Sequence, residues 1–288
     1  MMEREIIVAK EAGFCAGVRR AVQLASDCLG NEPCKALCSL GPLIHNPSVI
    51  EELGRKGMRV LDPSLDEEAI SKLPNNAKLL IRAHGVKKEQ YDVLKKHALD
   101  ILDGTCPHVI AIRKIIERAA KEGEPVVILG DKGHAEVTGL MSFAKEGIVV
   151  SSVTEVASLN LTKPFTVVCQ STLDSSTFES VTKEILRKYP FAKIFNTRCQ
   201  ATEKRQKEAL SLCENCDAMV VIGGIGSANS NRLAEICRGS GKATFFVTDP
   251  PNWEPKELGP YRRIGVTAGA STPQSDIDLI LSKLKSLI

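Results

Sequence analysis

Three cysteines with matching spacing are the residues of this sequence best suited to bind a metal. Cys15, Cys106 and Cys199 lie 91 and 93 residues apart, and each stands in a short loop between an apolar run and a helix-like segment. Loops that follow the strands of a parallel α/β sheet gather at one edge, where ligands bind. Three thiolates directed at one centre would hold zinc or an iron–sulfur cluster and leave one coordination position for substrate, as in catalytic metal sites.

Two further polar loops follow each of these cysteines, the first after 28 to 30 residues and the second after 64 to 73 residues. The first set is His45-Asn46, His134-Ala135-Glu136 and Ser227-Ala228-Asn229, and the second set is Ala83-His84-Gly85, Gln170-Ser171-Thr172 and Ser271-Thr272. The recurrence of three loops in three places favours three structural repeats over the two domains that 288 residues would suggest.

Several of these loops suit an anionic ligand. His45, His84 and His134 each follow a strand-like run in a polar or glycine-flanked loop, a context that favours contact with an anion. The glycine-rich loop at residues 223–230 lacks the Lys-Ser/Thr ending of a nucleotide P-loop. Its backbone amides, with Ser227 and Asn229, could still hold a diphosphate.

The second repeat also contains a candidate proton donor. Glu136 is a candidate proton donor, and Ser171 or Thr172 could relay the proton to a substrate. The plainer alternative is a glutamate that interacts with the dipole at the start of a helix, which is common.

Runs of β-branched residues alternate with amphipathic segments along the chain, a pattern typical of parallel sheets joined by crossover helices. Strands are expected over residues 5–10, 36–40, 78–82, 99–102, 125–129, 165–169, 192–195, 218–222, 243–247 and 262–267. Helices are expected over residues 17–29, 47–56, 107–122, 136–146, 176–188, 201–214, 229–238 and 274–287. The predicted fold is therefore α/β, with three pseudo-symmetric lobes around a central metal site. Each lobe is a small, mostly parallel sheet flanked by helices, at residues 1–98, 99–191 and 192–288.

Composition excludes other classes of function. A net charge of +3 and an aromatic content of 4% argue against a nucleic-acid partner. No apolar run approaches the ~20 residues that span a bilayer, and no signal peptide is evident, so we expect a cytoplasmic protein with no membrane partner. The other seven of the ten cysteines, including the pairs Cys34/Cys38 and Cys213/Cys216, are interpreted as structural or surface thiols.

Eight short motifs, in order from about residue 6 to 273, resemble those of the 4-hydroxy-3-methylbut-2-enyl diphosphate reductase family. They are GFCAGV at 13–18, GPLIHN at 41–46, RAHGV at 82–86, TCP at 105–107, GHAEV at 133–137, NTRC at 196–199, SANSNRL at 227–233 and TAGASTP at 267–273. The resemblance covers nearly the whole chain.

The resemblance implies an iron–sulfur oxidoreductase that catalyses the last step of the methylerythritol phosphate route to isoprenoids. In that family a two-electron reduction removes the substrate hydroxyl as water, giving isopentenyl and dimethylallyl diphosphates. A [4Fe-4S] cluster bound by Cys15, Cys106 and Cys199 would bind the substrate oxygen at its fourth iron. Ferredoxin or flavodoxin is implied as the electron donor.

The resemblance also implies roles for individual residues. Glu136 would be the proton source, assisted by Ser171 and His134. The allylic diphosphate substrate would be bound by His45, His84, His134, Ser171, Thr172, Ser227, Ala228, Asn229 and Ser271.

The sequence departs from the family pattern at two positions. Ser171 stands where the family often has threonine, which keeps the hydroxyl but loses the methyl group that fixes its rotamer. Ala228 stands where the family often has serine, so one side-chain contact to phosphate is missing. Two alternatives stay open: a zinc hydrolase of a small phosphorylated substrate with a three-thiolate site, and a non-catalytic iron–sulfur redox sensor.

Overall fold

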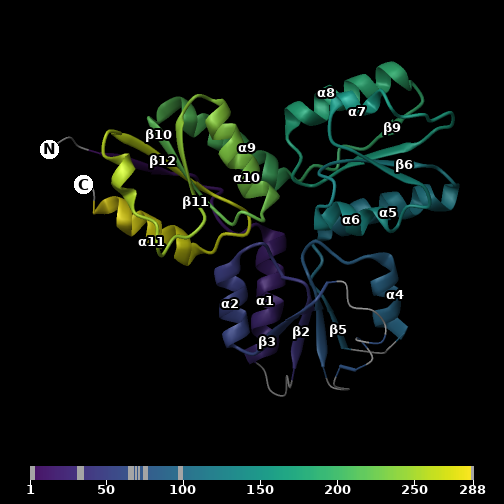
Figure 1. Ribbon diagram of the computed structural model, residues 1–288, viewed down its shortest axis with the longest axis horizontal. Helices are drawn as coiled ribbons and strands as arrows, with labels where there is room; N and C mark the ends of the chain where they lie inside the picture. Colours follow the sequence, from purple (N-terminus) through teal and green to yellow (C-terminus); the bar gives the residue numbers. More distant parts are fainter. Residues whose placement is uncertain are drawn as a thin grey trace. The chain divides into compact units, whose positions relative to one another are not determined.

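Three four-stranded sheets, with parallel pairing throughout, carry the fold of this protein (Figure 1). The structure is a computed structural model that describes residues 4–30, 36–63, 68, 70, 72–73, 77–96 and 100–286. The chain divides into two compact units. The terminal unit comprises Met1–Arg19, Ile44–Glu51 and Gln200–Ile288, and the central unit comprises Arg20–Leu43 and Glu52–Cys199.

Sheet A lies in the terminal unit and has the strand order β1-β12-β10-β11. Its strands are β1 (Glu5–Val8), β10 (Ala218–Ile222), β11 (Ala243–Val247) and β12 (Arg263–Ala268). Its helices are α9 (Gln200–Asn215), α10 (Ala228–Gly239) and α11 (Gln274–Lys285), with a short 3-10 helix at Pro255–Leu258. Ile277 and Ile280 of α11 pack on one face, while Cys213 of α9 and Cys237 of α10 belong to the core on the other.

Sheet B, in the central unit, has the order β3-β2-β4-β5. Its strands are β2 (Leu37–Leu40), β3 (Met58–Leu61), β4 (Lys78–Ile81) and β5 (Asp100–Asp103). The helices of this part of the chain are α1 (Ala16–Gly30), α2 (Pro47–Arg55) and α4 (Lys88–Lys96). Leu79 and Ile81 pack with Leu94 of α4 in one core cluster.

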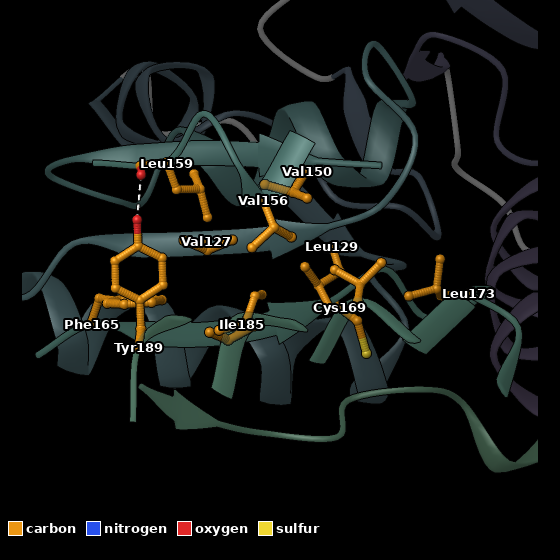
Figure 2. Close-up of a cluster of buried hydrophobic side chains, with 12 residues drawn as sticks. Val127, Leu129, Val150, Val156, Leu159, Phe165, Cys169, Leu173, Ile185 and Tyr189 are labelled. Atoms are coloured by element: carbon orange, nitrogen blue, oxygen red, sulfur yellow. Dashed lines mark hydrogen bonds between the residues drawn. The ribbon is translucent and has the colours of Figure 1, made fainter. Parts of the chain in front are cut away.

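Sheet C, also in the central unit, has the order β7-β6-β8-β9. Its strands are β6 (Val126–Leu129), β7 (Gly147–Val150), β8 (Thr166–Cys169) and β9 (Lys193–Ile194). Its helices are α5 (Pro107–Glu122), α6 (Ala135–Met141), α7 (Val153–Val156) and α8 (Ser175–Lys188). Helices α5 and α6 cover one face, and α7 and α8 cover the other. Figure 2 shows the latter core, where the Tyr189 hydroxyl donates a hydrogen bond to the Leu159 carbonyl.

The first strands of the second and third repeats each belong to the sheet of the repeat before. Strand β5, which leads to Cys106, pairs with β4, and β9, which leads to Cys199, pairs with β8. Strand β1, which leads to Cys15, pairs with β12 near the other end of the chain. The predicted lobe boundary at 98/99 lies outside the described residues, and the division into three lobes stays a prediction.

The α/β fold class with three parallel sheets flanked by helices is confirmed, and every predicted strand and helix has a counterpart. Strands β3 and β7, helices α4 and α7 and the 3-10 helix at Pro255–Leu258 were not predicted. The helix predicted over residues 136–146 is wrong at its end, because α6 stops at Met141. There the Ser142 hydroxyl bonds back to the Gly139 carbonyl at 2.6 Å, and the chain then turns into β7.

Candidate active site

The predicted site residues occur in both compact units, and the proton-donor candidates all lie in the central unit. Glu136, in the first turn of α6, is only 2% exposed. Its Oε1 accepts a hydrogen bond from the backbone N–H of Ser171 at 2.7 Å, and its Oε2 accepts one from the Ser171 hydroxyl at 2.7 Å. Both oxygens of a buried carboxylate are thereby satisfied by one residue. The predicted pairing of Glu136 with Ser171 is present, and serine reaches the carboxylate without the methyl group of threonine.

His134 is placed by the same short helix. It occupies the N-cap position of α6, and its Nδ1 accepts a hydrogen bond from the backbone N–H of Glu136 at 3.2 Å. Because Nδ1 acts as the acceptor, the N–H of the neutral ring lies at Nε2. Gly133 adopts a φ of 83°, a conformation that favours glycine, and so turns the chain into the cap.

The His84 ring lies beside that of His134. The ring centroids are 5.7 Å apart and the rings are nearly perpendicular, with an interplanar angle of 85°. His84 lies in the turn after β4, which Arg82 closes by donating from Nε to the Gly85 carbonyl at 3.1 Å. Two of the three predicted anion-binding histidines therefore share one place in the central unit.

Gln170 is a positioning residue that sequence reasoning did not assign to the site. Its side chain is 1% exposed, accepts from the backbone N–H of Asp131 at 2.8 Å and donates to the Thr172 hydroxyl at 2.9 Å. Gly130 lets it come this close, because a Cβ there would lie 2.7 Å from Gln170 Oε1. The only sequence signal was the place of Gln170 directly before the predicted hydroxyl pair.

Two of the three predicted cluster ligands lie in the central unit. Cys106 precedes α5, and its backbone N–H donates to the Ala83 carbonyl at 3.0 Å. Cys199 precedes α9, and its backbone N–H donates to the Ser171 carbonyl at 2.8 Å. Ser171 thus binds the Glu136 carboxylate through its own N–H and hydroxyl, and the Cys199 amide through its carbonyl.

Cys15 lies in the terminal unit, directly before α1. Its backbone N–H donates to the Ala270 carbonyl at 3.2 Å. The loop that leads to it is held by Arg205 of α9, which is 2% exposed and donates to the carbonyls of Glu11 at 2.8 Å and Gly13 at 2.9 Å. Gly13 has a φ of 93°, so this position favours glycine.

The terminal unit also contains a buried side-chain amide, that of Asn229, with no hydrogen-bond partner among the described residues. Asn229, in the first turn of α10, is 4% exposed, and neither its amide oxygen nor its amide nitrogen has a hydrogen-bond partner among the described residues. A buried amide normally finds a partner in the protein or in a ligand. Asn229 was predicted to bind the diphosphate, and its side chain is suited to that role.

The other predicted diphosphate residues of this unit surround the glycine-rich loop. Ser227 caps α10 by accepting from the Ser230 N–H at 3.3 Å, and Ala228 begins the helix. The Ser271 hydroxyl donates to the His45 carbonyl at 3.2 Å. A Cβ on Gly224 would lie 2.7 Å from that same carbonyl, so glycine is needed for this close approach.

The cysteines fall into two groups by burial. Cys15, Cys106 and Cys199 are half-buried, so these thiols are not enclosed in the hydrophobic core. Cys38, Cys169, Cys213, Cys216 and Cys237 are buried, and Cys28 is half-buried on α1. Burial raises the pKa of the Cys169 thiol, which disfavours the thiolate form that a metal requires. Cys34 lies outside the described residues.

The donor set fits a thiolate-bound metal or cluster, although the ligand assignment stays a prediction. Cys15, Cys106 and Cys199 each precede a helix, whose N-terminal amides favour a negative charge. The described residues include no group of three or more His, Cys, Asp or Glu side chains placed to hold a metal ion.

Comparison with known proteins places this chain in a family. The family model described as "LytB protein" matches residues 6–285. The chain belongs to the LytB protein family. The family resemblance seen in the motifs is thereby confirmed.

LytB-family relatives are similar to this chain over their whole length. A protein of Caldanaerobacter subterraneus subsp. tengcongensis is 38% identical over 284 residues, covering 98% of this chain and 97% of that protein. A protein of Geobacter sulfurreducens is 38% identical over 282 residues, with the same coverage. Both are named 4-hydroxy-3-methylbut-2-enyl diphosphate reductase.

Solved structures share the LytB-family fold. A reductase from Plasmodium falciparum matches 97% of this chain and 87% of its own, with a TM-score of 0.89 at 24% identity, and shows the fold alone. A second structure, of the (E)-4-hydroxy-3-methyl-but-2-enyl diphosphate reductase described as the terminal enzyme of the non-mevalonate pathway, has a TM-score of 0.71 at 33% identity. It covers 98% of this chain and 99% of its own. In the described part of the chain, no helix has the length and apolar character needed to cross a bilayer.

Proposed function

We propose that this LytB-family chain reduces 4-hydroxy-3-methylbut-2-enyl diphosphate to isopentenyl diphosphate and dimethylallyl diphosphate. The C–O bond to the hydroxyl breaks, two electrons and two protons are consumed, and the oxygen leaves as water. The observation that carries this proposal is the match to relatives of that name over 98% of this chain at 38% identity. The buried pair of Glu136 and Ser171 supports it, because the reaction needs a proton source.

The reaction also needs electrons that no side chain supplies, and we propose that Cys15, Cys106 and Cys199 hold a [4Fe-4S] cluster. Sulfur donors select iron–sulfur clusters or zinc among common metals. When bound, the cluster supplies the two electrons and a Lewis-acidic iron. The alternative of zinc would leave the chain without a redox centre. A ferredoxin or flavodoxin as electron donor and a cytoplasmic location, where thiols stay reduced, belong to the same proposal.

The hydrogen bonds of Glu136 determine which oxygen carries the proton. Oε1 faces the backbone N–H of Ser171, which can only donate, so Oε1 remains an acceptor. Oε2 faces the Ser171 hydroxyl, which can both donate and accept. When Glu136 carries a proton, Oε2 is the oxygen that can hold it, and the proton can pass through the Ser171 hydroxyl to the leaving oxygen.

The residues proposed to bind the diphosphate all offer hydrogen-bond donors. In the central unit, His84, His134 and Thr172 offer two imidazoles and a hydroxyl, and the neutral His134 ring presents its Nε2–H. In the terminal unit, the donors are the side chains of His45, Ser227, Asn229 and Ser271 and the backbone N–H of Ala228. Hydrogen bonds to a charged phosphate are stronger than those between neutral groups.

Anaerobic purification followed by a spectrum and an activity assay tests the proposal. Broad visible absorption, equal amounts of iron and sulfide, and turnover of the allylic diphosphate with a reduced dye as electron donor are expected. A colourless, zinc-loaded protein would overturn the proposal in favour of a hydrolase. A protein with an intact cluster that does not turn over the substrate would be an iron–sulfur sensor or carrier.

A further inference from the structure

We propose that His108 is a positioning residue that ties the Cys106 loop to the Cys199 loop. Its Nε2 lies 2.7 Å from the carbonyl oxygen of Thr197, and both residues belong to the central unit. His108 is the second residue of α5, two positions after Cys106, and Thr197 lies two positions before Cys199. The inference rests on the proposed function only in that these two loops are taken to carry cluster ligands.

The direction of this hydrogen bond is fixed by chemistry. A backbone carbonyl can only accept, so His108 must carry a proton on Nε2. The distance lies within the normal range for an N–H···O bond. Both the neutral Nε2–H tautomer and the cation can make this bond, so it does not depend on titration of the ring.

The other polar groups of Thr197 face β8. Its hydroxyl donates to the Cys169 carbonyl at 2.7 Å and accepts from the Cys169 N–H at 2.8 Å. The N–H of Phe195 donates to the Val167 carbonyl at 2.9 Å. The Cys199 N–H donates to the Ser171 carbonyl, so that residues 195, 197 and 199 all bond to the chain at β8 or just after it. Residues 195–199 therefore follow β9 beside β8, and the Thr197 side chain takes the place of backbone bonds there.

His108 holds this segment from its other side. The bonds to β8 use alternate residues of the segment, while the Thr197 carbonyl points to α5 and is bound by the imidazole. The N-terminus of α5 is itself anchored through the bond from the Cys106 N–H to the Ala83 carbonyl. The His108 imidazole thus links the Cys106 loop to the Cys199 loop, each of which is otherwise bound to a different strand end.

Two substitutions of His108 by amide side chains of different length test whether the bond to the Thr197 carbonyl matters. His108→Gln can place its amide nitrogen near the position of Nε2, whereas His108→Asn carries the same amide group but is too short to reach Thr197. The measurement is hydrogen–deuterium exchange of the Cys199 amide in the full chain, purified anaerobically. Iron and sulfide content and the rate of cluster loss in air are determined on the same samples.

Relative to the unsubstituted chain, His108→Asn is expected to raise the exchange rate of the Cys199 amide and the rate of cluster loss by up to about tenfold, as for the loss of one hydrogen bond. His108→Gln should restore both to within about twofold. Residues 227–233 of the terminal unit should exchange equally in all three proteins. Equal exchange of the Cys199 amide in the Asn and Gln variants would overturn the proposal.

The outcomes separate this inference from the proposed function. Absence of iron and sulfide from the unsubstituted chain would overturn the cluster, while the exchange rates would still decide the role of His108. If His108→Asn does not fold, the 15N resonances of the His108 ring in the unsubstituted chain decide instead. A protonated, slowly exchanging Nε2 supports the bond, and an unprotonated Nε2 excludes it.

Discussion

Glu136 and Ser171 form a two-point contact in which each carboxylate oxygen has a different kind of donor. Oε1 is bound by a backbone amide and Oε2 by a hydroxyl, both at 2.7 Å. The two oxygens are therefore chemically inequivalent, and only Oε2 can exchange a proton with its partner. In the proposed proton transfer the hydroxyl bond would change direction while the backbone bond keeps the carboxylate in place.

Glu136→Gln should lower kcat by a factor of about 10²–10⁴ with little change in KM, because the general acid is lost while diphosphate binding is not. The glutamine oxygen can still accept from the Ser171 N–H, and its amide nitrogen then donates to the Ser171 hydroxyl. Steady-state kinetics with a reduced dye measure the effect. Glu122→Gln, at the end of α5, is the matched control and should leave kcat unchanged. A Glu136→Gln variant with normal kcat would remove Glu136 from the mechanism.

Asn229→Leu should raise the stability of the protein while it weakens binding of the diphosphate substrate. The buried amide has no hydrogen-bond partner among the described residues, so an apolar side chain removes a desolvation cost and is expected to stabilise the full chain by about 1 kcal/mol. The same change should raise KM for the diphosphate at least tenfold. Urea unfolding and kinetics provide the two measurements. Lower stability combined with normal KM would contradict both the burial argument and the binding role.

Ala228→Ser should improve diphosphate binding. Ala228 begins α10 beside Ser227 and Asn229, and a hydroxyl at this position would add one phosphate contact worth about 1 kcal/mol, or roughly a fivefold lower Kd. Calorimetric titration with the substrate under anaerobic conditions measures the gain. Gly239→Ser, at the far end of the same helix, is the control. No gain in affinity for Ala228→Ser would count against this use of the α10 N-terminus.

Asp276 gives the stability of the chain a defined pH dependence. Burial raises the pKa of its carboxyl group, although hydrogen bonds from Asn46 and Ser48 partly oppose the effect. The folded state thus holds this proton more tightly than the unfolded state, whose pKa is about 3.9. The stability contributed by the group is present below that value and is lost as the pH rises through the raised folded pKa.

Asp276→Asn does not titrate, so the variant should gain stability relative to the unsubstituted chain as the pH increases above about 4. Urea unfolding at a series of pH values between 3.5 and 6 checks this trend. Asp278→Asn, on the exposed side of the same helix, serves as the control. A stability difference that stays constant across this range, or that changes in the opposite direction, would show that burial does not raise the pKa of Asp276.

Most of the fold could be predicted from the sequence because the central strands are continuous apolar runs. Residues 126–129 and 218–222 are buried throughout, so their hydrophobic signal is strong. Edge strands β3 and β7 are partly exposed, and β3 contains Arg59, which weakens the apolar pattern of a strand. Helix α4 is rich in charged residues and buries only Leu94, so its amphipathic signal is weak.

The contact between Glu136 and Ser171 could be predicted from the sequence, but the groups that hold the candidate site residues could not. Glu136 and Ser171 stand in recurring loops, and the recurrence made them visible. Gln170, Arg205 and His108 act through hydrogen bonds to the backbone or to a neighbouring side chain, and such bonds depend on which strands and helices become adjacent. That adjacency depends on how the strands pair and on which helices cover them, which the spacing of the cysteines does not reveal.

The pairing of β1 with β12 has a consequence for the timing of synthesis. Glu5 is opposite Arg263 in the register, so the first strand to leave the ribosome waits for one of the last. At cellular rates of translation the delay is roughly ten seconds to a minute. The Cys15 amide, bound by Ala270, reaches its place only after that strand has emerged. Delivery of the proposed cluster to this cysteine is therefore expected to follow translation, and a chain that stops short of residue 270 would lack the contact that holds the Cys15 loop.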